Sequence, residues 1–180
     1  LGVVGFEVAE IDRLVEGLAP EEPDDPADDA LPASPPPRCR LGDVWALGPH
    51  RLVIGDSLDP DVVAGLMNGA EARMVFTDPP YNVAIDGHVC GLGRHKHREF
   101  AFANGEMAED EFITFLTTSL GAAAATMLDG AIAFVCMDWR HMGELLEAGR
   151  ACFTELKNLV VWNKTNGGMG TFYRSKHELV

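Results

Sequence analysis

Four consecutive residues, Asp78 to Tyr81 (DPPY), carry the groups in this sequence that are best suited to chemistry. They directly follow the apolar run from Met74 to Phe76, which predicts a short buried strand. In open α/β sheets, ligands bind beyond the carboxyl ends of the strands. The segment therefore predicts a ligand site at the end of that strand. A proline-rich turn without a chemical role is the structural alternative.

The residue types in this segment suit the activation of an amine attached to a nucleobase. Such an amine is a poor nucleophile because its lone pair is delocalised into the ring. The Asp78 carboxylate and the Pro79 carbonyl can each accept one N–H, which aims the lone pair at an incoming methyl group. Proline fixes φ and brings no competing N–H, and Tyr81 offers a flat face on which an extruded base can stack.

These residues resemble motif IV of the S-adenosylmethionine-dependent amino-methyltransferases of DNA, which methylate adenine N6 or cytosine N4. Segments 42–57 and 162–178 resemble the class of that family in which motif IV precedes the cofactor motif. The resemblance covers residues 40–180 and implies S-adenosylmethionine as cofactor and double-stranded DNA as partner. The residues that it implies are, for catalysis, Asp78, Pro79, Pro80 and Tyr81; for the cofactor, Asp56, Thr77 and Asp78; and for the substrate, Tyr81, Asn82, Lys164, Tyr173 and His177.

The sequence departs from that family in its cofactor loop, because it contains no Phe-x-Gly-x-Gly after a strand. The glycines in 91–93 follow no apolar strand, and those in 167–170 open no clear helix, so both sets predict turns. In the resembling class the loop follows the target-recognition region. We therefore expect the chain to be the first part of a catalytic domain and to be inactive alone.

Several functions are compatible with these residues. Asp at the first motif position favours adenine N6, and cytosine N4 stays open. RNA or a protein amide is a second substrate class, although methyltransferases of glutamine usually carry Asn at that position. A DNA-binding or partition-type module that keeps the fold without catalysis is an alternative of another class.

The segment 86–105 has glycines and clustered charge without a clear period, which predicts a long loop. Four of its residues are of metal-binding type: His88, Cys90, His95 and His97. Their spacing fits no common structural-zinc pattern, so no metal site is predicted. Its basic residues predict phosphate contacts, with a solvated loop as the alternative: Arg94, Lys96 and Arg98.

Composition narrows the class of protein. The chain of 180 residues is 47% hydrophobic and 23% charged, as in ordinary globular proteins. No stretch approaches ~18 apolar residues, so no membrane-spanning helix is predicted. Four scattered cysteines without a C-x-x-C pair indicate a reducing cytoplasm. The net charge of −14 argues against a nucleic-acid partner, but residues 1–38 supply −8 of it.

The uneven composition along the chain indicates its domain organisation. Residues 6–18 carry an apolar stripe at helical spacing, and 1–18 predict the tail of an upstream domain, which resembles ParB-like fusions to such methyltransferases. Residues 19–38 hold seven of the eleven prolines and six carboxylates, which predicts a disordered acidic linker. Residues 39–180 then form the N-terminal part of the catalytic domain.

Strands and helices alternate from Arg40 onward, which is typical of an α/β fold. The fold class expected is a partial Rossmann-like methyltransferase domain, with buried strands in a mostly parallel sheet flanked by helices. Strands are expected at 51–55, 73–77, 131–137, 158–162 and 178–180. Helices are expected at 59–67, 109–128 and 141–150, with Gly130 ending the second of them.

Overall fold

The computed structural model describes residues 38–84, 101–164 and 176–180. All of them except Arg38 belong to one compact unit, Cys39–Val180. The expected helix at 6–18 and residues 19–37 of the expected linker at 19–38 lie outside the described residues, as do the four residues of metal-binding type and Tyr173.

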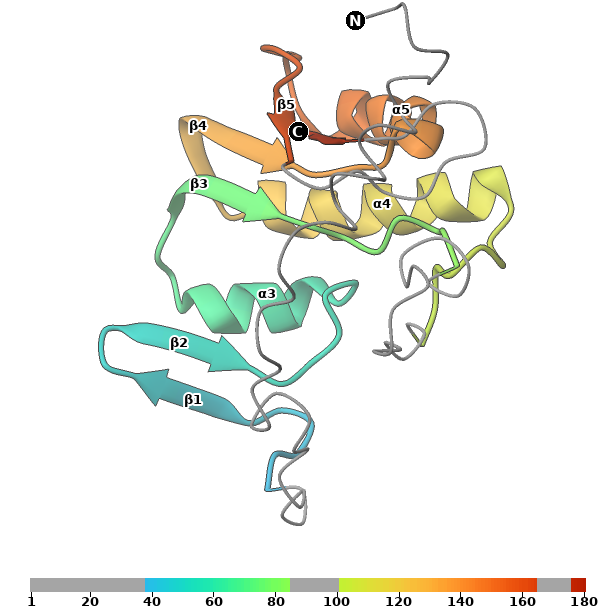
Figure 1. Ribbon diagram of the computed structural model, residues 1–180. Coiled ribbons are helices and arrows are strands. Elements are labelled where there is room, and N and C mark those ends of the chain that lie inside the picture. Colours follow the sequence, from blue (N-terminus) through green and yellow to red (C-terminus); the bar gives the residue numbers. More distant parts are fainter. Residues whose placement is uncertain (1–37, 85–100, 165–175) are drawn as a thin grey trace, which may run out of the picture. The chain divides into compact units, whose positions relative to one another are not determined.

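The described residues form a mixed α/β structure (Figure 1). A single 3₁₀ turn, Trp139–His141, precedes the last helix. In chain order the elements are β1 (Val44–Leu47), β2 (His50–Val53), α3 (Pro60–Met67), β3 (Ala72–Thr77), α4 (Glu109–Ala124), β4 (Met127–Val135), α5 (Met142–Cys152), β5 (Val161–Asn163) and β6 (His177–Leu179).

The strands pair two by two in the described part of the chain. β1 and β2 form an antiparallel hairpin, β3 and β4 are parallel, and β5 and β6 are antiparallel. A single bridge, Met137 to Leu179, joins the segment after β4 to β6. The expectation of a mostly parallel sheet therefore holds only for β3 and β4.

Helix α3 begins and ends as its sequence predicts. The Asp59 side chain accepts a hydrogen bond from the backbone N–H of Asp61, and Pro60 occupies the first turn. Asn68 ends the helix in a left-handed conformation with φ of 50°. The expectation of a helix at 59–67 is confirmed.

Helix α4 ends four residues earlier than expected, because β4 begins at Met127. The Ala72 N–H donates to the Thr126 carbonyl at 2.8 Å, and Ala72 pairs with Met127 in the parallel ladder. Between this pair and the pair Met74–Ile132, β3 advances by two residues and β4 by five. Gly130 lies in that irregular stretch with φ of 79°, so its role as a helix end was wrongly predicted.

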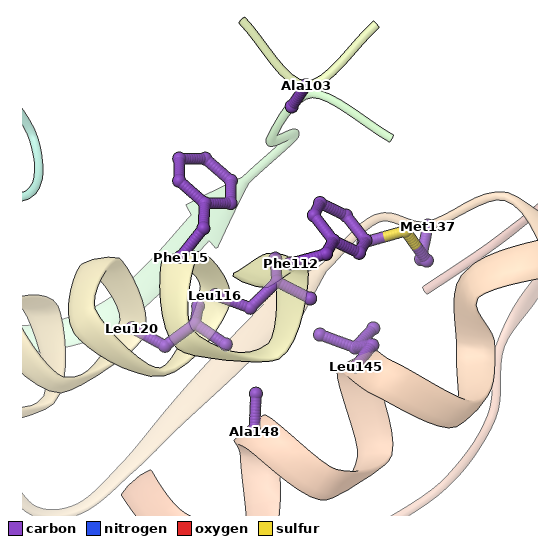
Figure 2. Packing of buried hydrophobic residues seen from close by; sticks show 8 residues of the cluster. All are labelled: Ala103, Phe112, Phe115, Leu116, Leu120, Met137, Leu145 and Ala148. Carbon is purple, nitrogen blue, oxygen red and sulfur yellow. The ribbon is translucent and has the colours of Figure 1, made fainter. Parts of the chain in front are cut away.

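The hydrophobic core lies between α4 and α5 (Figure 2). α4 presents apolar residues at i, i+3, i+4 and i+8, starting from Phe112, and these side chains are buried. The buried cluster consists of Ala103, Phe112, Phe115, Leu116, Leu120, Met137, Leu145 and Ala148. Met137 brings the segment that follows β4 into this core.

The strands are less buried than expected. Val135 packs against the core, whereas Met74, Phe76 and Ile132 are 58%, 64% and 48% exposed. Successive side chains of a strand point to opposite faces, so these three residues share the face opposite to Val135. The prediction of buried strands is wrong for one face of β3 and β4, since the core covers only the other face.

Candidate active site

The DPPY segment leaves β3 at its carboxyl end. Asp78 is exposed, whereas Tyr81 is half-buried and packs against the core. The Tyr81 hydroxyl donates a hydrogen bond of 2.6 Å to Oδ1 of Asp78. The carboxylate and the aromatic ring, three residues apart in the sequence, are therefore held together as one group.

The surroundings of Tyr81 keep its hydroxyl protonated. Burial raises the pKa of the Tyr81 hydroxyl far above its ordinary value, and the hydrogen bond to Asp78 raises it further. The negative charge of Glu178 acts in the same direction. The hydroxyl consequently remains a hydrogen-bond donor to Asp78 through the neutral pH range.

Asn82 ties the DPPY segment to the loop that precedes α4. Its side chain is buried, and its backbone adopts a left-handed conformation with φ of 54°. Nδ2 donates to the Met107 carbonyl at 2.9 Å, while Oδ1 accepts from Gly105 and Met107 at 3.0 and 3.2 Å. These bonds position Tyr81 through its neighbour. The contact of Asn82 with the substrate stays a prediction.

Glu106 fixes the same loop from the other side. Its carboxylate accepts hydrogen bonds from the backbone N–H groups of Ala103 and Asn104, at 2.5 and 2.6 Å. Its own backbone N–H and these two groups lower the pKa of the Glu106 carboxyl. The loop that contacts Asn82 is thus held by charge-assisted hydrogen bonds.

Strands β5 and β6 bring an ion pair to the same region. The Lys164 ammonium donates to Oε1 of Glu178, and the backbone N–H of Lys164 donates to the Lys176 carbonyl at 2.6 Å. The bridge between Met137 and Leu179 attaches β6 to the segment that follows β4. Lys164, a predicted substrate-binding residue, is therefore already paired with a carboxylate.

Cys136 lies where these groups meet. Its backbone N–H donates to the Thr77 carbonyl at 2.9 Å, which places it beside the end of β3. Burial raises the pKa of the Cys136 thiol, and the charges of Asp78 and Glu178 raise it further, while Lys164 opposes them. Asp78, Glu178 and Lys164 consequently act on one position at the carboxyl ends of β3 and β4.

The remaining predicted site residues differ in their surroundings. Asp56 is exposed in the turn before α3, where Oδ1 accepts from the Leu58 backbone N–H at 2.9 Å. Thr77, Pro79 and Pro80 are half-buried at the end of β3. His177 is exposed on β6. No hydrogen bond between Asp56 and the DPPY group is found in the described residues.

Sequence reasoning missed three features of this site. It predicted neither the Tyr81–Asp78 hydrogen bond nor the structural role of Asn82, and it gave Glu178 no function. Asn82 offered one signal, because asparagine is enriched in left-handed turn positions. The pairing of Lys164 with Glu178 had no local signal, since the two residues meet only when β5 and β6 pair.

The geometry of the DPPY segment is that of a ligand-binding position. A carboxylate acceptor and an aromatic ring are fixed together at the carboxyl end of a parallel strand, which is where ligands bind in open α/β sheets. The model of the DNA methylase family matches residues 72–180. The chain therefore belongs to the DNA methylase family of N6-adenine and N4-cytosine methyltransferases.

The match confirms the family that the DPPY segment predicted, and it runs from the start of β3 to the end of the chain. The ParB-like fusion stays a prediction. No curated protein and no solved structure matches the chain. None of the described helices is long and apolar enough to span a membrane, and no group of three potential metal ligands lies within the described residues.

Proposed function

We propose that this protein transfers a methyl group from S-adenosylmethionine to the exocyclic N6 amine of an adenine flipped out of double-stranded DNA. The observation that carries the proposal is the pairing of Asp78 with Tyr81 at the end of β3. Membership of the DNA methylase family supports DNA as the substrate. Asp rather than Asn or Ser at the first motif position favours adenine, with cytosine N4 as the alternative.

Asp78 activates the amine in this proposal. Its carboxylate accepts one N–H of the amine, and the Pro79 carbonyl accepts the other. The nitrogen lone pair is thereby directed away from the ring. As the nitrogen bonds to the methyl carbon, the bond from that carbon to the sulfonium sulfur of the donor would break, and the nitrogen would carry positive charge until it releases one N–H proton. The negative charge of Asp78 stabilises that state more than the neutral starting amine, which lowers the barrier.

Tyr81 holds the base in this proposal. Its ring supplies a face for stacking, and its hydroxyl orients the Asp78 carboxylate through the 2.6 Å hydrogen bond. Since one carboxylate oxygen is engaged by Tyr81, the other is left to accept from the amine. Asn82 fixes the backbone that carries Tyr81, so it acts as a positioning residue.

The chain carries part of a site for the cofactor. S-adenosylmethionine supplies an electrophilic methyl group on a sulfonium cation when it is bound. Asp56 fits the role of an acid near its adenosine, because its side chain is exposed and oriented by the Leu58 N–H. The glycine loop that would let the backbone approach the cofactor closely is absent from the sequence.

The proposal is tested by methylation with the complete gene product. Unmethylated duplex DNA, RNA and a protein mixture are incubated with labelled S-adenosylmethionine, and the products are digested and separated. Label in N6-methyldeoxyadenosine derived from DNA is expected. Label in N4-methylcytosine would favour the alternative base, and label only in RNA or protein would contradict the proposal. A cytoplasmic location, where the DNA substrate is accessible, is part of the same proposal.

Tyr81→Ala is expected to lower methylation by roughly one to two orders of magnitude, because base stacking contributes about 1–3 kcal/mol. Tyr81→Phe keeps the ring and removes only the hydrogen bond to Asp78, so the methylation rate should fall by about tenfold at most. Single-turnover rates on a duplex, measured beside thermal melts, compare the two variants. Equal losses in both would show that the ring face does not hold the base.

The chain of 180 residues is expected to bind S-adenosylmethionine weakly, with a dissociation constant above about 1 mM. The reason is that the sequence lacks the Phe-x-Gly-x-Gly loop. Glycines in such a loop let the backbone approach the cofactor closely, because they have no side chain to obstruct it. Isothermal titration calorimetry measures this directly. Micromolar affinity would mean that another segment of the chain forms the cofactor site.

A further inference from the structure

Trp139 and Arg140 form an exposed aromatic–cation pair that the proposed methyl transfer does not use. Trp139 is 55% exposed in the 3₁₀ turn that follows β4. The guanidinium carbon of Arg140 lies 4.7 Å from the centroid of the indole ring. An indole with an arginine against its face is a combination found in surfaces that stack the bases of single-stranded nucleic acids.

Asp138 fixes this pair in place. Its Oδ1 accepts from the Arg140 backbone N–H at 2.8 Å, and its two carboxylate oxygens accept from Nη1 of Arg140 at 3.0 and 2.9 Å. The side chain of Arg140 is therefore ordered before any ligand arrives, which reduces the entropy lost on binding. The carboxylate also offsets the arginine charge, so the surface suits a flat base better than a phosphate.

The position of the pair relates it to the DPPY group. The Cys136 N–H donates to the Thr77 carbonyl, which places the segment that leaves β4 beside the residue that precedes Asp78. Trp139 follows Cys136 by three residues, a chain length of at most about 10 Å. Successive nucleotides of one DNA strand rise by about 3.4 Å. A nucleotide within about three positions of the target is thus within reach.

We propose that Trp139 and Arg140 form a stacking platform for a base adjacent to the flipped target nucleotide. Extrusion of the target deprives its neighbours of a stacking partner, and an indole face can replace that partner. This inference rests on the proposed DNA substrate and adds a second contact to it. Because Asp138 neutralises Arg140, the contact acts through stacking and not through the release of counterions.

Fluorescence of single-tryptophan variants tests the contact in the chain of 180 residues. One variant keeps Trp139, with Trp45 and Trp162 changed to phenylalanine, and a matched control keeps only Trp45 of the β1–β2 hairpin. Each is titrated at low salt with a duplex that carries one mismatched adenine, which is easily extruded. We expect DNA to quench Trp139 strongly and to leave Trp45 unchanged.

Affinity measurements complete the test. Trp139→Ala should weaken DNA binding by about tenfold or more, and Trp139→Phe by less, while Trp45→Ala should have no effect. The slope of log K against log salt should be the same for wild type and Trp139→Ala. Since Trp139 is exposed, thermal melts should show that the variant folds normally.

The outcomes separate the platform from the proposed function. Binding of DNA without quenching of Trp139, and with unchanged affinity in Trp139→Ala, would overturn the platform and leave the proposed DNA substrate intact. A smaller salt slope for Trp139→Ala than for wild type would indicate that this region contacts phosphates instead of stacking on a base. That result would overturn the platform as well. If wild type binds no DNA at all, the platform is overturned, and the methylation assay with the complete gene product decides the DNA substrate.

Discussion

Asp78→Ala is expected to lower the single-turnover rate of methyl transfer by about 10³-fold, with cofactor affinity largely intact. In the proposed mechanism the carboxylate stabilises charge that develops on the attacking nitrogen only in the transition state, so its loss should appear in the chemical step. Removal of one such electrostatic contact typically costs about 10²–10³ in rate. The same change also releases the Tyr81 hydroxyl from its acceptor, which loosens the ring that holds the base.

A matched control separates chemistry from stability. Asp129→Ala removes an exposed carboxylate from β4, away from the end of the strand where Asp78 acts. Rates from the complete gene product are compared with thermal melts of both variants. If DPPY were only a structural turn, Asp78→Ala would lower the melting temperature and the activity together. An Asp78→Ala protein that folds normally and methylates at the wild-type rate would remove Asp78 from the mechanism.

Phe112→Ala is expected to lower the free energy of unfolding by about 3–5 kcal/mol. Phe112 is fully buried, its ring stacks on Phe115 at a centroid distance of 5.9 Å, and it meets the His141 ring edge-on at 5.2 Å. Figure 2 shows the ring pointing toward the side chain of Met137. Truncation leaves a cavity between α4 and the segment that directly follows β4.

Urea denaturation of the chain measures this loss. Phe76→Ala is the control, because the same atoms are removed from a side chain that is 64% exposed, and its cost should be below about 1 kcal/mol. Similar losses in the two variants would mean that the packing around Phe112 contributes little. The loss of packing around Phe112 would also affect the site, because Met137 carries the bridge to Leu179 and thus positions β6.

Local patterns determined much of this protein. The apolar run before Asp78 predicted a strand that ends at the DPPY segment, and β3 ends at Thr77. Helices were expected at 59–67 and 141–150, and they are found as α3 and α5. Such signals lie within a few residues of the element that they specify, so they can be read without knowledge of distant partners.

Pairing between distant segments decided what the sequence missed. Nothing between Ala122 and Leu128 signals a helix end, yet α4 ends at Ala124 because Met127 pairs with Ala72 of β3. Strands that were predicted to be buried are exposed on one face, because burial depends on which elements cover a sheet. Helix propensity is a weak preference that strand pairing overrides.

The sequence by itself predicted the family, which is confirmed, and the DPPY segment supplied both the proposed acceptor and the proposed aromatic ring. The tertiary structure alone decided how these groups are held. Asn82 reaches Gly105 and Met107 across more than twenty residues, and Lys164 meets Glu178 only through the pairing of β5 with β6. Hydrogen bonds between segments far apart in the sequence leave no local pattern, because their geometry exists only once the core has brought those segments together.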